Sequence, residues 1–170
     1  MPRGLKQTSA PLVISFSTDE LVVNTFQQEQ VSMQLNVLDR EVMVVTGINI
    51  DVEPPNGIAG VDTITLASLS ATSRTSVGSL ADTNVLAVSR DSITSSGYVD
   101  NGVAFTQSFG ETPSAGMDYL QIISTNDFFI QVQGEGNLTP KGMQGKLFCY
   151  RAVADADVFA ALVQSELLSA

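Results

Sequence analysis

Hydrophobic and polar residues alternate with a two-residue period along much of this chain. Aliphatic residues occupy every second position from Val31 to Val37, and Val42, Val44, Ile48 and Ile50 continue the pattern. Successive side chains of a strand point to opposite faces, so this pattern predicts strands with one buried and one solvated face. Ten candidate strands, some of which are expected to be loops, lie at 11–17, 20–26, 30–38, 41–52, 61–70, 84–90, 102–109, 118–124, 127–133 and 144–153.

Turn signals separate these candidate strands, as in Pro54-Pro55-Asn56-Gly57. Many short strands joined by turns favour an all-β sandwich or barrel over alternating strands and helices. Two connectors, 71–83 and 91–101, are long and rich in Ser and Thr, and such loops often contact other subunits or ligands. The 170 residues predict one domain, divided into a flexible segment over 1–10, a β-sandwich over 11–153 and a helical segment over 154–170.

The apolar period changes near the end of the chain. Asp155 and Asp157 precede apolar residues at helical spacing, and Asp is favoured at helix starts. An amphipathic helix is therefore predicted over 155–168, which would either cover the end of the sandwich or lie at a subunit interface. Its apolar stripe comprises Val158, Phe159, Leu162, Val163 and Leu167.

Residues that commonly carry catalysis are scarce in this sequence. It contains no histidine and one cysteine, Cys149, which lies in an apolar run and is expected to be a buried thiol. Without an imidazole, nucleophilic catalysis of the Ser-His or Cys-His type is excluded. A Ser-Lys pair has no supporting spacing. Eighteen acidic residues provide many chance carboxylate pairs for glycoside hydrolysis, but there is no tryptophan and there are three tyrosines to form a sugar-binding platform. We therefore expect no enzymatic activity and no cofactor.

Oxygen atoms are the metal ligands that this composition leaves available, and they suit Ca²⁺ or Mg²⁺. Asp51, Glu53 and Asp62 bracket the Pro-Pro-Asn-Gly turn and could converge on a calcium ion. A solvated acidic loop is the commoner explanation for such a group. No metal site is therefore predicted, and calcium binding by this loop stays open.

The chain is acidic but sparsely charged. Its net charge is 8 − 18 = −10, while charged residues make up 15% and hydrophobic residues 44% of the sequence. Nucleic-acid binding requires clustered Lys and Arg side chains that neutralise phosphates, and here the basic residues are scattered. Direct binding to nucleic acid is therefore not expected. A sparsely charged surface is easier to bury against copies of the same chain.

Two late strands carry apolar residues on both faces. In 127–133 the side chain of Phe129 is on the other face of the strand from Phe128. In 146–152 Phe148 and Tyr150 are on the other face from Leu147. A lone sandwich leaves one sheet face in water, so either the C-terminal helix or another subunit is expected to cover the outer face. The candidate assembly interface comprises Phe129, Phe148, Tyr150, Phe159 and Leu162.

The closing stretch Gln144-Gly145-Lys146-Leu147-Phe148-Cys149-Tyr150-Arg151, followed by Asp157-Val158-Phe159, resembles the ends of single jelly-roll capsid proteins of icosahedral viruses. With the strand count and the Ser/Thr-rich loops, the likeness covers roughly residues 20–153. The resemblance implies an eight-stranded jelly-roll β-sandwich with a short C-terminal α-helix. It also implies self-assembly into an icosahedral shell, together with other capsid proteins, and no catalytic residues. The expected location is the virion, assembled in the host cytoplasm, since the start of the chain lacks the apolar core of a signal peptide.

The chain departs from one common capsid pattern. Many small viral shells neutralise the packaged genome with a basic N-terminal arm, whereas only Arg3 and Lys6 lie in this segment. A shell over an internal membrane, or one with separate packaging proteins, fits better, as in viruses built from upright single jelly rolls. Two other classes stay open. One is a filament or pilus subunit that assembles by strand exchange, and the other is a carbohydrate-binding β-sandwich module, which the few aromatic residues disfavour.

Overall fold

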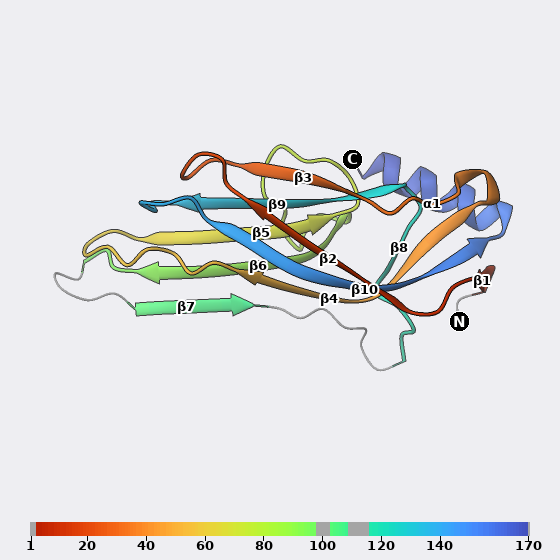
Figure 1. Cartoon of the computed structure of the whole chain (residues 1–170), viewed down its shortest axis with the longest axis horizontal. Helices are drawn as coiled ribbons and strands as arrows, with labels where there is room; N and C mark the ends of the chain where they lie inside the picture. Colours follow the sequence, from red (N-terminus) through yellow and green to blue (C-terminus); the bar gives the residue numbers. More distant parts are fainter. Residues whose placement is uncertain (1–2, 98–102, 109–115, 170) are drawn as a thin grey trace.

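The chain forms two antiparallel sheets and one C-terminal helix in the computed structural model, which describes residues 3–97, 103–108 and 116–169 (Figure 1). The first sheet contains β1 (Leu5–Gln7), β2 (Leu12–Asp19), β4 (Glu41–Val52), β8 (Gln121–Ile123) and β10 (Gly142–Ala154). The second contains β3 (Gln27–Ser32), β5 (Thr63–Ser70), β6 (Val85–Thr94), β7 (Val103–Ser108) and β9 (Asp127–Glu135). The 3₁₀ turn η1 (Val37–Asp39) precedes β4, and the helix α1 (Ala156–Leu168) follows β10.

The strand order is that of a jelly roll. The first sheet has the order β2–β10–β4–β8 and the second the order β3–β9–β5–β6, and the chain crosses repeatedly between them. Two further strands are described at the edges, where β1 pairs with the end of β10 and β7 pairs with β6. The predicted all-β jelly-roll sandwich with a short C-terminal helix is therefore confirmed.

The main hydrophobic core lies between the two sheets. Rings of Phe16 from β2 and Phe128 from β9 meet edge to face, with centroids 5.8 Å apart. Alternate residues of each strand fill this layer because the strand period is two. Cys149 is buried there, as expected, and burial raises the pKa of its thiol to about 11. The buried members of this core include Phe16, Met43, Ile48, Ile50, Leu69, Phe128, Ile130, Val132, Met143 and Leu147.

A bulge in β4 changes which face its aliphatic residues occupy. The pairing of β4 with β10 shifts between Phe148 and Cys149, so Thr46 is the extra residue on β4. Val42 and Val44 consequently lie outside the main core, whereas Ile48 and Ile50 lie inside it. The prediction that all four share one face is wrong, because the bulge inverts the alternation.

Part of the segment predicted to be flexible forms a strand. The sequence predicts a flexible segment over residues 1–10, yet Leu5–Gln7 forms β1 and pairs with the last three residues of β10. The cause is the length of β10, which extends past Cys149, where its pairing with β2 ends. β1 occupies the edge that would otherwise be open, and Leu5 is buried.

Two other predicted strands differ in the structure. Residues 20–26 form a turn in which Asn24 has a φ of 57°. β3 ends at Ser32 although the alternation continues, because Gln34 has a φ of 52° and interrupts the extended backbone. Met33 and Leu35 are buried all the same. Their alternation therefore reports burial without strand pairing.

The two predicted Ser/Thr-rich connectors also have different outcomes. The first joins β5 and β6 as residues 71–84 and is called the 71–84 loop below. The second is predicted over 91–101, but residues 91–94 belong to β6. Positions 98–101 of that connector lie outside the described residues.

Candidate assembly surface

Helix α1 covers part of the outer face of the first sheet. Below it lies a second apolar cluster, separate from the main core and built from β1, β4, β8 and β10. Tyr150, Phe159 and Leu162 pack against this cluster and are partly buried. The structure therefore brings together three of the five predicted interface residues. The buried members of the cluster are Leu5, Val42, Val44, Ile122, Ala152 and Ala154.

The other two predicted residues lie apart from this group. Phe148 is on the same face of β10 as Tyr150, and 41% of its surface is exposed. Phe129 is on β9 of the second sheet, where it pairs with Ser70 and is partly buried. Two-sided burial of the late strands is thus explained in part within the chain itself, because α1 covers the end of β10.

Glu166 holds the C-terminal half of α1 on the sheet. Its Oε1 atom accepts a hydrogen bond of 2.7 Å from the backbone N–H of Ser124, which follows β8. The Glu166 Oε2 and Ser124 Oγ atoms are buried without a hydrogen-bond partner. Burial raises the pKa of the Glu166 carboxyl, and the hydrogen bond from the Ser124 backbone N–H offsets part of that rise.

Sequence reasoning missed Glu166 and assigned Leu167 to the apolar stripe. In the structure Glu166 is buried, and 71% of the surface of Leu167 is exposed. The helical period contains a signal for this arrangement, since Val158, Leu162 and Glu166 are spaced four residues apart and share one face. An acidic residue is not expected at a buried position, because burying an unpaired charge is costly.

The outward side of α1 forms an open apolar groove. Its volume is about 520 Å³, and no charged side chain lines it. We call it the α1 groove. It is lined by Phe159, Ala160, Val163, Gln164, Leu167 and Leu168.

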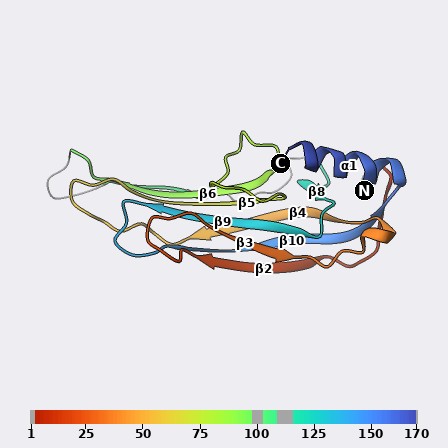
Figure 2. The same ribbon diagram turned by 90° about the horizontal axis from the view of Figure 1, so that it is seen from above.

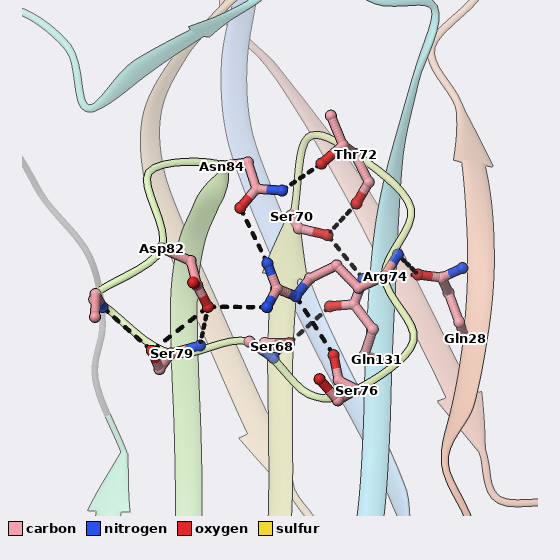
Figure 3. Close-up of polar contacts among 12 residues, drawn as sticks. Gln28, Ser68, Ser70, Thr72, Arg74, Ser76, Ser79, Asp82, Asn84 and Gln131 are labelled. Atoms are coloured by element: carbon pink, nitrogen blue, oxygen red, sulfur yellow. Dashed lines mark hydrogen bonds and ion pairs between the residues drawn. The ribbon is translucent and has the colours of Figure 1, made fainter. Parts of the chain in front are cut away.

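A buried polar network covers part of the outer face of the second sheet (Figure 3). Gln131 on β9 is fully buried there, and its Oε1 atom accepts a hydrogen bond of 2.6 Å from the hydroxyl of Ser68. The Gln131 Nε2 atom donates to Ser70 Oγ at 2.8 Å and to Gln28 Oε1 at 3.1 Å. Four strand residues therefore satisfy one another beneath the 71–84 loop.

Arg74 fastens this loop to the network (Figure 3). Its backbone N–H donates to Gln28 Oε1 at 2.8 Å. Its guanidinium donates to Asn84 Oδ1 at 3.0 Å and forms an ion pair of 2.9 Å with Asp82. Asn84 in turn donates to the hydroxyl of Thr72. The 71–84 loop, which the sequence predicts to contact other subunits or ligands, is thus bonded to the sheet of its own chain.

The three acidic residues of the possible calcium site do not come together. Asp62 Oδ1 accepts hydrogen bonds of 2.8 and 2.7 Å from the N–H groups of Ser95 and Ser96. Glu53 accepts one from the N–H of Gly142, and Asp51 accepts one from the side chain of Gln144. Within the described parts of the chain, no three acidic or thiol side chains lie close enough to share a metal ion.

Helix α1 is too short to cross a membrane, and it is the sole α-helix in the residues that the structure describes.

Comparisons with known proteins give no family assignment. No family model matches the sequence, and no curated protein matches it. Among solved structures, a chain from Desmodium yellow mottle tymovirus is similar over 92% of this chain and 95% of its own length, with 13% sequence identity. The TM-score of that comparison is 0.29, which is too low to carry an argument about fold or function. Function must therefore be argued from the chain itself.

Proposed function

We propose that this chain is a structural subunit of a viral capsid that assembles with copies of itself into a closed shell. The observation that carries the proposal is the α1 groove, an uncharged apolar surface that one copy leaves open. Exposed apolar surfaces of this kind mark interaction sites on soluble proteins. The jelly-roll topology agrees with the proposal, since capsid domains are among the proteins that use it.

The same proposal covers partners and location. We expect other capsid proteins beside this one, with an internal membrane or separate packaging proteins in place of direct genome binding. Two of the basic side chains form ion pairs within the chain: Arg74 pairs with Asp82, and Arg151 pairs with Glu41 at 3.3 Å. Lys141 is buried. The subunit would have no catalytic role and would assemble in the host cytoplasm into the virion.

Analytical ultracentrifugation and negative-stain electron microscopy of the purified protein test this function. We expect closed particles whose share rises with salt, because the net charge of −10 makes copies repel one another until ions screen them. A monomer at every concentration, salt and pH tested would contradict the proposal. Fibres would favour the filament class instead.

A further inference from the structure

We propose that Asn56 is a site of spontaneous modification, at which the backbone nitrogen of Gly57 attacks the side-chain amide and expels ammonia. The product is a succinimide ring, which water opens to aspartate or isoaspartate. This chemistry belongs to the connection between β4 and β5, residues 53–62. It is independent of the proposed self-assembly, since it needs one copy of the chain and water.

The backbone of Asn56 is fixed on both sides of its Cα atom. The β4–β5 connection lies beside the β9–β10 connection, at the end of the molecule opposite α1 (Figures 1 and 2). The Asn56 N–H donates to Oδ1 of the buried Asn137 at 2.9 Å. The Asn56 carbonyl accepts a hydrogen bond of 2.7 Å from the hydroxyl of Thr63. Asn56 therefore links the two connections.

Three hydrogen-bond donors converge on the side-chain oxygen of Asn56. Its Oδ1 atom accepts from the N–H of Leu138 at 3.0 Å, from the N–H of Thr139 at 3.3 Å and from the Thr139 hydroxyl at 3.2 Å. Attack on the amide carbon places negative charge on this oxygen. Donors that already point at the oxygen stabilise that charge as it develops, in the manner of an oxyanion hole. The amide carbon of Asn56 is thus more electrophilic than that of a solvated asparagine.

Gly57 supplies the nucleophile with little steric hindrance. The chain itself holds the Gly57 nitrogen near the Asn56 amide carbon, so ring closure is intramolecular and requires no encounter between molecules. Glycine has no Cβ atom that would crowd the nitrogen as the ring closes. Gly57 is exposed, and its N–H donates to no partner in the parts of the chain that the structure describes. Hydroxide can therefore reach this N–H and remove its proton.

Water is the only co-reactant that the reaction requires. Hydroxide takes the proton of the Gly57 N–H, the bond from this nitrogen to Asn56 Cγ forms, and the Cγ–Nδ2 bond breaks. Water protonates Nδ2, which leaves as ammonia, and hydroxide is regenerated. A second water then adds to one of the two ring carbonyls. Breaking the new bond gives aspartate, whereas breaking the original peptide bond gives isoaspartate.

The two products should affect the link between the connections differently. Aspartate keeps an oxygen for the N–H groups of Leu138 and Thr139, and its charge strengthens those hydrogen bonds. Isoaspartate adds a carbon to the main chain between the Asn56 Cα atom and Gly57, so it should loosen the contact with Thr63. Either product changes the net charge of one copy from −10 to 8 − 19 = −11.

Peptide mapping by mass spectrometry, after incubation of the purified folded chain at several pH values, tests the inference. We expect the peptide that contains residue 56 to gain the mass difference between NH and O and to separate into two isomers. Its rate of conversion should rise about tenfold per pH unit, because hydroxide removes the Gly57 proton. The other Asn-Gly pair, Asn101-Gly102, lies outside the described residues and is followed on its own peptide.

Two variants separate the nucleophile from the donors. Gly57→Ala adds a Cβ atom that meets nothing within 4 Å, at a residue without a positive φ, so the fold and the bonds to Asn56 should stay intact. We expect it to slow conversion about tenfold or more. Thr139→Val keeps Gly57 and removes one donor to the oxygen. It should slow conversion about fivefold, as the loss of one hydrogen bond to the developing charge would.

The parent chain unfolded in guanidinium chloride is the matched control, because it keeps the Asn56-Gly57 pair and loses the three donors. We expect the folded chain to convert about threefold faster or more at the same pH. Slower conversion in the folded chain would show that the fixed backbone holds the reacting atoms apart, and would overturn the inference. Conversion of Gly57→Ala or of Thr139→Val at the parent's rate would overturn it as well. Thermal unfolding of each variant confirms that the comparison is made between folded chains.

Discussion

Glu166 is the residue whose environment departs most from the ordinary behaviour of its type. A buried carboxylate with one unpaired oxygen is costly when charged, and the surrounding structure gives it a single short bond to Ser124 N–H. The rise in its pKa expresses this cost. The carboxyl is nevertheless useful, because it satisfies a backbone N–H that the helix would otherwise bury.

A dependence of stability on pH follows from the Glu166 carboxyl. Above the ordinary pKa of 4.5, folded protein still holds a proton that the unfolded chain has released. The contribution of this group is therefore complete below pH 4.5 and is lost as pH rises through the folded pKa. Glu166→Gln keeps an oxygen for Ser124 and cannot ionise. The free energy of unfolding of this variant minus that of the parent should thus rise with pH across the window.

Urea unfolding of both proteins between about pH 4 and pH 8 measures that difference, since the midpoint and slope give each free energy. Titrations elsewhere in the chain cancel in the comparison. A difference that stays constant with pH would show that Glu166 carries the same charge in the folded and unfolded states.

Helix α1 has one face for the sheet and another for the groove. Leu162 packs on the cluster beneath the helix, whereas Leu167 points away from it. Phe159 contributes to both faces, since it packs on the cluster and lines the groove. Substitutions along the helix should therefore separate folding from assembly.

Leu162→Ala and Leu167→Ala form a matched pair for this test. Leu162 is partly buried, so we expect its loss to lower the free energy of unfolding by about 1–3 kcal/mol, less than a fully buried leucine would cost. Leu167→Ala should change stability by no more than about 0.5 kcal/mol, as exposed positions do, while weakening assembly. Chemical denaturation and sedimentation measure the two effects. Equal destabilisation by both would mean that the groove face is buried within one copy.

The whole molecule combines strong acidity with large uncharged surfaces. Outer faces of both sheets are partly covered by the chain itself, through α1 on one side and the 71–84 loop on the other. The outward side of α1 presents an apolar surface with no charged side chain, the α1 groove. Electrostatic repulsion between copies and apolar attraction at exposed surfaces such as the α1 groove should together set the salt dependence of assembly.

Nucleic-acid binding should be weak for the same reason. We expect single- and double-stranded nucleic-acid probes to bind with a dissociation constant above about 0.1 mM at physiological salt. The reason is that the Lys and Arg residues are scattered along the sequence and form no cluster that could release counterions from the phosphates. Filter binding over a range of salt concentrations measures this. Tight binding with a steep salt dependence would contradict the proposed separation of genome packaging from this subunit.

The sequence by itself determined the features that depend on local periodicity. Alternation over residues 127–133 and helical spacing over 155–168 match β9 and α1 closely, because the side chains of neighbouring residues decide such patterns. The burial of Cys149 follows from its apolar neighbours in the same way.

Only the tertiary structure decided the features that depend on distant segments. Ser68 and Gln131 look like solvated polar positions in a strand, yet the 71–84 loop buries them together. Asn24 and Asn137 are separated by 113 residues and join the β2–β3 connection to the β9–β10 connection. The Thr46 bulge and the burial of Glu166 likewise depend on the neighbouring strand and on Ser124. No local pattern contains these pairings, since they arise when the sheets and loops are brought into register.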